Sequence, residues 1–319
     1  MKKYILLPTL ANIKISFVKN CKKLYFVNSA FLILNAALYS GCTKDAENVK
    51  LKEIDPKLVI GCFISPQDTM IVATVMRSNP IFGKNHNSNQ SIKSIVNAQV
   101  IISNGTQTIT LPYNSIKDNY EIAATLFPIT SGATYQLEVT TPENGKVSAE
   151  CTVPPVNVDS INVTFDTLGA SKELILKWKD IPNQSNYYKV FVQEILVITS
   201  EFFGTLHHDT TYGVLWTDKS LMNDVDQDGN IITTKYQIFF DHYGGGGGNG
   251  GPTTKSKTIG FNLYLMNISD EYYKYEQSLN RYGYDNPFSE PSPIYSNVKG
   301  GGLGIFAGYQ KLEVKIDLP

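Results

Sequence analysis

The chain has 319 residues, of which 42% are hydrophobic and 18% are charged, so it carries enough apolar side chains for two domains of ordinary size. That composition excludes a chain that is disordered along most of its length. Six of the 28 lysines and arginines lie in residues 1–41, where no acid occurs, and the rest of the chain therefore holds 22 basic against 29 acidic residues. A mildly acidic body argues against nucleic acid and anionic lipid headgroups as partners.

Residues 1–41 have the organisation of a signal peptide. Lysines up to Lys23 form a basic region, and residues 24–39, LYFVNSAFLILNAALY, form an apolar one. A transmembrane helix needs roughly 20 apolar residues, and this run is shorter and is interrupted by Asn28 and Asn35. We therefore expect residues 1–41 to be cleaved off, with an uncleaved membrane anchor as the alternative.

Cys42 ends the stretch LYSGC, which resembles the lipobox of bacterial lipoproteins. In these proteins the signal peptidase cuts before a cysteine whose thiol carries a diacylglyceryl group. The resemblance implies lipidation of Cys42, where acyl chains such as palmitate supply the two or more signals that stable membrane attachment needs. The following Lys44, Asp45 and Glu47 are similar to the lysine-plus-acid signal that sends Bacteroidota lipoproteins to the cell surface.

A first β-sandwich is predicted for residues 56–155, after a tether of residues 42–55. Seven runs there have period-two alternation or many β-branched residues, at 57–64, 69–77, 97–103, 107–112, 119–125, 134–140 and 146–153. Two links between these runs contain Asn-Gly pairs, at 104–105 and 144–145, which favour tight type I′ hairpins. Seven short strands in this length are typical of an immunoglobulin-like sandwich.

Two cysteines, Cys62 and Cys151, fall in predicted strands of this domain, each on the face that carries apolar residues. Two alternatives stay open at the level of sequence. The thiols are free and buried, since cysteine packs as a small hydrophobe, or an oxidising envelope joins them in a disulfide if the two strands are neighbours.

Residues 156–319 begin with the strand-like runs SINVTF, ELILKWKD and NYYKVFVQEILVIT. Trp178 followed by Tyr187 and Tyr188 resembles the core of a fibronectin type III domain. Long insertions interrupt this pattern, among them the glycine tract at residues 244–251, which has the composition of a flexible, exposed linker. We predict a fibronectin type III-like β domain with inserted loops.

One insertion contains DVDQDGN, in which Asp224, Asp226 and Asp228 alternate before Gly229, as in the first half of an EF-hand loop. Three carboxylates this close repel one another, and Ca²⁺ with oxygen ligands would relieve the repulsion. Against a calcium site, Lys235 stands where the bidentate glutamate belongs, and the flanking segments do not read as helices. A plain hairpin turn is therefore the alternative.

A helix is predicted at residues 270–282, with Ser269 as N-cap and acidic residues in the first turn. Four of its residues form one stripe: Tyr272, Tyr275, Leu279 and Tyr282. A stripe at this spacing is typical of core, so we expect it to pack against the second sandwich, with an exposed recognition surface as the alternative.

The segment ISDEYYKYEQSLNRYGYDNPFSEPSPIYSNVKGGGLGIFAGY, at residues 268–309, is similar to the C-terminal signature of the domain-of-unknown-function 4249 family of Bacteroidota lipoproteins. KLVIGCFIS, VNAQVII and TVPP agree with its N-terminal part. The resemblance implies an all-β outer-membrane lipoprotein built from two sandwiches. Members are often encoded beside TonB-dependent receptors, and since the family has no established activity, no functional residue can be carried over.

The sequence lacks three common catalytic or metal-binding motifs. Neither a G-x-S-x-G elbow, an H-E-x-x-H pair nor a C-x-x-C pair occurs. We therefore expect no catalytic residues and predict a surface-exposed ligand-binding or accessory module of a TonB-dependent nutrient-uptake system. A structural or adhesive surface protein and a hydrolase of unrecognised type are the alternatives.

Overall fold

The computed structural model describes residues 55–78, 94–143, 145–156, 158–166, 172–202, 205–215, 217, 219–238, 241–244, 254–282 and 293–318. Residues 1–52 and 53–319 are separate compact units, and only the second contains described residues. Cys42 and residues 245–251 of the glycine tract lie outside the described residues. Within the described residues, no helix is long and apolar enough to cross a membrane.

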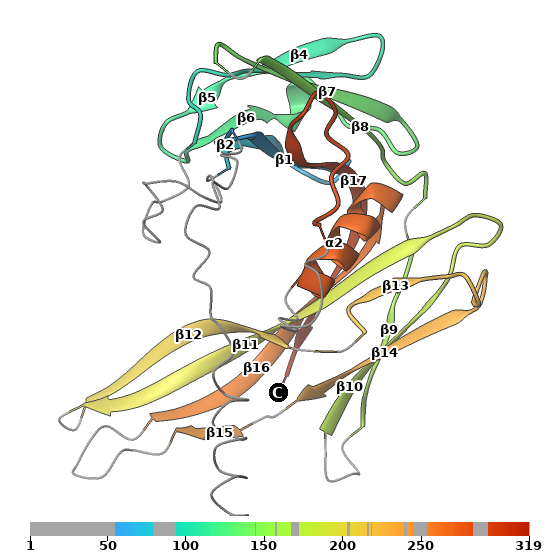
Figure 1. Cartoon of the computed structure of the whole chain (residues 1–319). Coiled ribbons are helices and arrows are strands. Elements are labelled where there is room, and N and C mark those ends of the chain that lie inside the picture. The colour runs from blue at the N-terminus through green and yellow to red at the C-terminus, as the bar shows by residue number, and fades with distance from the viewer. Residues whose placement is uncertain are drawn as a thin grey trace, which may run out of the picture. The chain divides into compact units, whose positions relative to one another are not determined.

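The predicted all-β class is confirmed (Figure 1). The first half of the described chain forms β1 (Leu58–Ile64), β2 (Met70–Arg77), β3 (Gln99–Ser103), β4 (Thr108–Leu111), β5 (Tyr113–Asn114), β6 (Asn119–Ala123), β7 (Thr134–Thr141) and β8 (Gly145–Thr152), with a 3-10 turn η1 (Ala124–Leu126). All seven runs predicted from alternation are strands here. The short strand β5 was not predicted.

These strands form a first sandwich of two sheets. One sheet has the order β1-β2-β6-β5 and the other β4-β3-β7-β8. Every second residue of β1 is buried, and the same is true of the central part of β7, so the two sheets supply one shared apolar core. Leu137 and Val139 of β7 are fully buried in it, together with Ile60 of β1. The period-two alternation of the sequence therefore has its expected cause, which is burial of one face of each sheet.

The two Asn-Gly hairpins exist, but their loops are longer than the predicted type I′ turns. Ser103 pairs with Thr108, which leaves residues 104–107 as the first loop. Asn104 there accepts hydrogen bonds at Oδ1 from the backbone N–H groups of Thr106 (3.1 Å) and Gln107 (2.8 Å), and only Gly105 of the Asn-Gly pair has a positive φ. The asparagine side chain thus organises a wider loop. Thr141 pairs with Gly145, which leaves residues 142–144 as the second.

The second half forms β9 (Asn162–Asp166), β10 (Lys172–Lys179), β11 (Tyr187–Phe202), β12 (Thr205–Leu215), β13 (Leu221–Asn223), β14 (Ile231–Ile238), β15 (Asp241–Gly244), β16 (Thr254–Ile268), α2 (Asp270–Tyr282) and β17 (Leu303–Asp317). A three-stranded sheet, β14-β10-β9, shares a core with the strands β12-β11-β16-β17. Trp178 and Tyr188 lie in this core with ring centroids 5.6 Å apart.

The C-terminal strand β17 belongs to both sandwiches. Leu303 to Gly308 pair in parallel with β1, and Tyr309 to Asp317 pair antiparallel with β16. As a result one ten-stranded sheet, β12-β11-β16-β17-β1-β2-β6-β5 with β13 and β15 attached, runs through both cores. Phe306 is buried in the first core, whereas Leu312 packs against the second. The segment 156–319, assigned above to the second domain alone, therefore also supplies a strand to the first.

The predicted helix is α2, and its first stripe residue is buried as expected. Tyr272 packs with its ring centroid 4.7 Å from that of Phe63 on β1 and 6.3 Å from that of Tyr309 on β17. Tyr275 belongs to the same cluster and lies 6.4 Å from Phe63. The prediction that the stripe packs against the second sandwich was too narrow, because β17 brings side chains of both sandwiches under the helix. The side chain of Tyr282 lies outside the described residues.

Candidate carboxylate site

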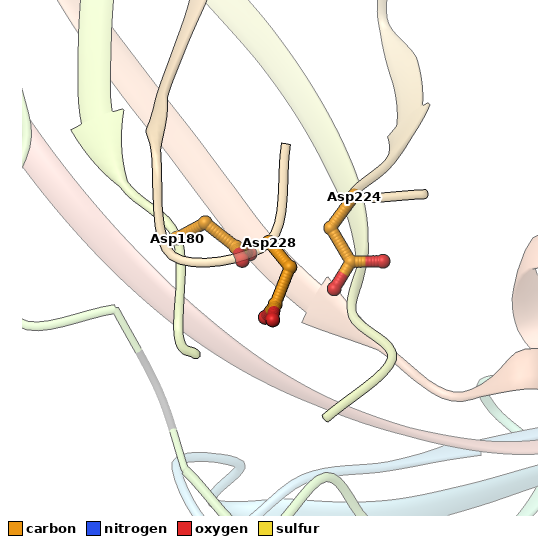
Figure 2. A group of neighbouring side chains, drawn as sticks. All are labelled: Asp180, Asp224 and Asp228. Atoms are coloured by element: carbon orange, nitrogen blue, oxygen red, sulfur yellow. The ribbon is translucent and has the colours of Figure 1, made fainter. Parts of the chain in front are cut away.

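Three aspartates meet at one end of the second sandwich. Asp180, Asp224 and Asp228 each place one carboxylate oxygen within 4.8 Å of the others. Asp180 directly follows β10, Asp224 directly follows β13, and Asp228 lies in the turn before β14. Figure 2 shows the three side chains converging from these separate segments. Asp180 and Asp224 are 2% and 4% exposed, while Asp228 is exposed.

Two consecutive turns position Asp224 and Asp228. The N–H of Gln227 donates to the carbonyl oxygen of Asp224 at 2.7 Å, and the N–H of Asn230 donates to that of Gln227 at 2.8 Å. Gly229 has a φ of +66°, a left-handed conformation that glycine adopts without a steric penalty. The N–H of Asp180 then donates to the carbonyl oxygen of Asn230 at 2.8 Å, which joins the turn to the end of β10.

The buried carboxylate of Asp180 is held on both oxygens. Its Oδ1 accepts a hydrogen bond from the hydroxyl of Tyr188 at 2.6 Å, and its Oδ2 accepts one from the N–H of Gly229 at 2.7 Å. Burial, followed by the hydrogen bond to Asp180, raises the pKa of the Tyr188 hydroxyl well above its usual range. Tyr188 therefore stays a donor to Asp180 at physiological pH.

The loop between β10 and β11 holds the other two carboxylates. The backbone N–H of Asn186 donates to Asp224 Oδ2 at 2.8 Å, and the N–H of Asn183 donates to Asp228 Oδ1 at 2.9 Å. The side-chain amide of Asn186, itself 3% exposed, donates to the carbonyl oxygen of Ile181 at 2.7 Å. Each carboxylate thus accepts hydrogen bonds that tie the segment 224–230 to the segment 180–186.

Two of the three aspartates predicted from DVDQDGN take part. Asp224 and Asp228 are in the group, whereas Asp226 is exposed and is not. Asp180 takes its place. The register of β10 with β14, in which Lys179 pairs with Ile231, brings Asp180 beside this turn. The sequence shows a carboxylate directly after a strand, but nothing in it shows which turn that strand end meets.

Comparison with known proteins places nearly all of the described region in one family. Residues 46–314 match the family model described as Domain of unknown function (DUF4249). The chain belongs to this family. The membership predicted from the C-terminal signature is therefore confirmed, and the matched DUF4249 region contains all three aspartates. No curated protein matches the chain.

The carboxylate site of this DUF4249 chain differs from an EF-hand. Strands β13 and β14 flank the turn where an EF-hand has helices. Lys235, at the twelfth loop position, pairs with Glu173 of β10 at 2.8 Å. The contacts form a hydrogen-bonded link between two loops. One carboxylate oxygen of each aspartate is also close enough to the other two to share a calcium ion whose shell further oxygens would complete. Calcium binding stays a prediction, now centred on Asp180, Asp224 and Asp228.

The two strand cysteines of the DUF4249 region are both buried, Cys62 on β1 and Cys151 on β8. Both are free thiols in the structure. β1 and β8 lie in different sheets of the first sandwich, and both cysteines belong to the core that these sheets share, so a disulfide between the sheets stays a prediction. Burial raises the pKa of both thiols well above the usual range, so they stay protonated and pack as small apolar groups.

Proposed function

We propose that the chain is a lipoprotein of the outer membrane, held by acyl chains on Cys42 and facing the cell exterior. Its two sandwiches act as a binding or accessory module of a TonB-dependent nutrient-uptake system. The observation that carries this proposal is the position of Cys42. It ends the apolar run of the sequence, and the region that matches the family begins shortly afterwards, at residue 46.

The boundary of the compact unit supports this anchoring. That unit begins at residue 53, so residues 43–52 separate it from Cys42. Ten residues span at most about 35 Å when fully extended. Two or more acyl chains on one residue attach a protein stably to a bilayer, whereas a single chain does so only marginally. A body tethered in this way stays within reach of a receptor in the same membrane.

The all-β architecture supports a binding role. Two sandwiches share one continuous sheet, and loops held by such a rigid scaffold are common positions for recognition residues. The genetic neighbourhood implied by the family resemblance supplies the kind of partner, a TonB-dependent receptor. If the sandwiches acted only as spacers, no association with such a receptor would be expected.

Membrane fractionation with affinity capture tests the proposal. The full-length chain, tagged after Pro319, is expected in the outer-membrane fraction and is expected to co-purify a TonB-dependent receptor. The matched Cys42→Ser variant is expected in the soluble fraction, because it cannot be acylated. Retention of Cys42→Ser in the membrane would overturn the anchor, and capture without any receptor would overturn the accessory role.

A further inference from the structure

Strand β12 forms one edge of the ten-stranded sheet. It pairs with β11 along its whole length, from Thr205 opposite Phe202 to Leu215 opposite Val192, without a break in register. In Figure 1 it lies on the outer side of β11. No strand in the described part of the chain pairs with its other side. Its outer row of backbone N–H and C=O groups can therefore accept another strand.

Natural sheets usually protect such an edge with a short strand, lysine, proline or a bulge. β12 has the sequence TLHHDTTYGVL, with no lysine, arginine, glutamate or proline, and its 11 residues exceed those of every other edge strand described. The edge strands β8 and β14 carry Lys146 and Lys235, and the pairing of β12 with β11 has no register shift over the described residues, whereas the pairing of β11 with β16 has one. β12 is thus long, and Asp209 is the one residue of fixed charge along it.

The outer part of β12 also exposes apolar side chains. Leu206, Tyr212 and Val214 are 59%, 58% and 70% exposed. Their even spacing places all three on one face of the strand. A strand added along this edge would place its own side chains beside these three, in addition to satisfying the backbone groups.

We propose that β12 pairs antiparallel with β12 of a second copy of the chain, about a twofold axis through Thr210. Along a strand, successive residues turn their backbone N–H and C=O groups to opposite edges. In an antiparallel pair of identical strands, two residues that lie opposite each other must therefore both have even numbers or both have odd numbers, so that the sum of the two numbers is even. With the axis at Thr210, the numbers of any two opposite residues add up to 420, which satisfies this condition. All 11 residues of the strand are then paired, because Thr210 is its midpoint. The proposal is independent of the lipid anchor.

The sequence of β12 is complementary to itself in this register. On the exposed face Leu206 meets Val214, His208 meets Tyr212 and Thr210 meets its own copy. Apolar, aromatic and threonine pairs of this kind stabilise neighbouring strands when directly opposite. On the other face Asp209 meets Thr211, so no two like charges stand opposite each other.

This match favours a second copy over an unrelated strand. An isologous contact uses one patch twice, and each exposed apolar residue of β12 then has an apolar or aromatic counterpart. Pairing along 11 residues forms about ten backbone hydrogen bonds and removes the open edge of both sheets.

Disulfide trapping in native membranes tests the register. In the Thr210→Cys variant of the full-length protein, the two cysteines face each other at the distance that a disulfide requires. Mild oxidation is expected to give at least fivefold more dimer than it gives in the control variant Ile116→Cys. Ile116 is 93% exposed and lies in the turn between β5 and β6. Co-expressed His208→Cys and Tyr212→Cys chains are expected to cross-link with each other.

A dimer yield from Thr210→Cys no higher than that of Ile116→Cys would overturn the proposal. So would a cross-linked product that contains a different protein, or failure of the His208→Cys and Tyr212→Cys pair. Adding Tyr212→Lys and Val214→Lys to Thr210→Cys changes only exposed side chains, so the melting temperature is expected to stay the same while the cross-link falls at least tenfold. An unchanged cross-link in that variant would also contradict the proposed pairing.

Discussion

Gly304 lies where β17 runs beside β1, and the absence of a side chain there is a steric requirement. Its φ is +114°, and a Cβ at this position would collide with the carbonyl oxygen of Ile60. Gly304→Ala is therefore expected to lower the free energy of unfolding by about 3 kcal/mol or more, measured by urea denaturation.

Gly301 is the matched control for this change. Its φ is +85°, but a Cβ there would meet nothing within 4 Å. Gly301→Ala should cost only the strain of the left-handed conformation, about 1–2 kcal/mol. Equal losses in the two variants would show that backbone conformation, and not the close approach to β1, is what Gly304 provides.

Asp180 is expected to stabilise the end of the second sandwich. Replacing it with alanine leaves the buried Tyr188 hydroxyl and the Gly229 N–H without their acceptor. Each unsatisfied buried group costs about 1–3 kcal/mol, so Asp180→Ala should lower the free energy of unfolding by roughly 2–4 kcal/mol. Asp226→Ala, at an exposed neighbouring aspartate, should change it by less than about 0.5 kcal/mol.

Calcium binding is tested on the exposed member of the same group. Titration calorimetry is expected to show binding in the millimolar range typical of weak extracellular sites. Asp228→Asn should abolish the heat, because it removes a charge without emptying a buried position, and Asp226→Asn should leave it unchanged. Absence of heat in the unmodified protein would leave the group as a hydrogen-bonded link between loops.

At the scale of elements, α2 is the segment whose packing joins the two sandwiches. Its residue Tyr272 packs against Phe63 of β1, and Lys189 of β11 pairs with Glu276 of the helix at 2.7 Å. Tyr272→Ala should lower the free energy of unfolding by about 3–4 kcal/mol, as other large-to-small core changes do. Lys274→Ala, on the exposed side of the helix, should cost less than about 0.5 kcal/mol. A Tyr272→Ala protein that melts like the parent would contradict the packing role.

The elements themselves were readable from the sequence because their signals are local. Alternation located β1 to β8, apart from the two-residue β5, and Ser269 with the acidic first turn located α2 within its observed bounds. The side-chain hydroxyl of Ser269 accepts the N–H of Tyr272 at 3.4 Å, and its carbonyl oxygen accepts that of Tyr273 at 3.0 Å. The loop at Asn104 is longer than the predicted two-residue turn. The rule for Asn-Gly pairs does not consider the hydrogen bonds that the asparagine side chain accepts from the loop backbone.

Long-range pairing could not be read in the same way. Nothing local shows that β17 pairs with β1 through Ile305 and with β16 through Val314. Residues 305–308 are buried in an unbroken run and the second half of the strand alternates, but neither pattern indicates a partner strand. For the same reason Asp180 was missed while Asp224 was found. The candidate site depends on which strand ends meet, and the two aspartates belong to segments that only the fold brings together.

At the scale of the whole molecule, the account rests on how the chain is held. The compact unit begins at residue 53, and its first strand, β1, lies inside the ten-stranded sheet between β17 and β2. The proposed binding at loops, calcium binding and pairing through β12 all concern this unit, whereas the proposed place of the protein in the cell depends on Cys42.

Mass spectrometry of the native N-terminus tests that central claim most directly. The account predicts a mature chain that begins with Cys42 and carries a diacylglyceryl group on its thiol, with a third acyl chain at its amine. Residues 1–41 should be absent. An unmodified N-terminus at any other residue would contradict the account.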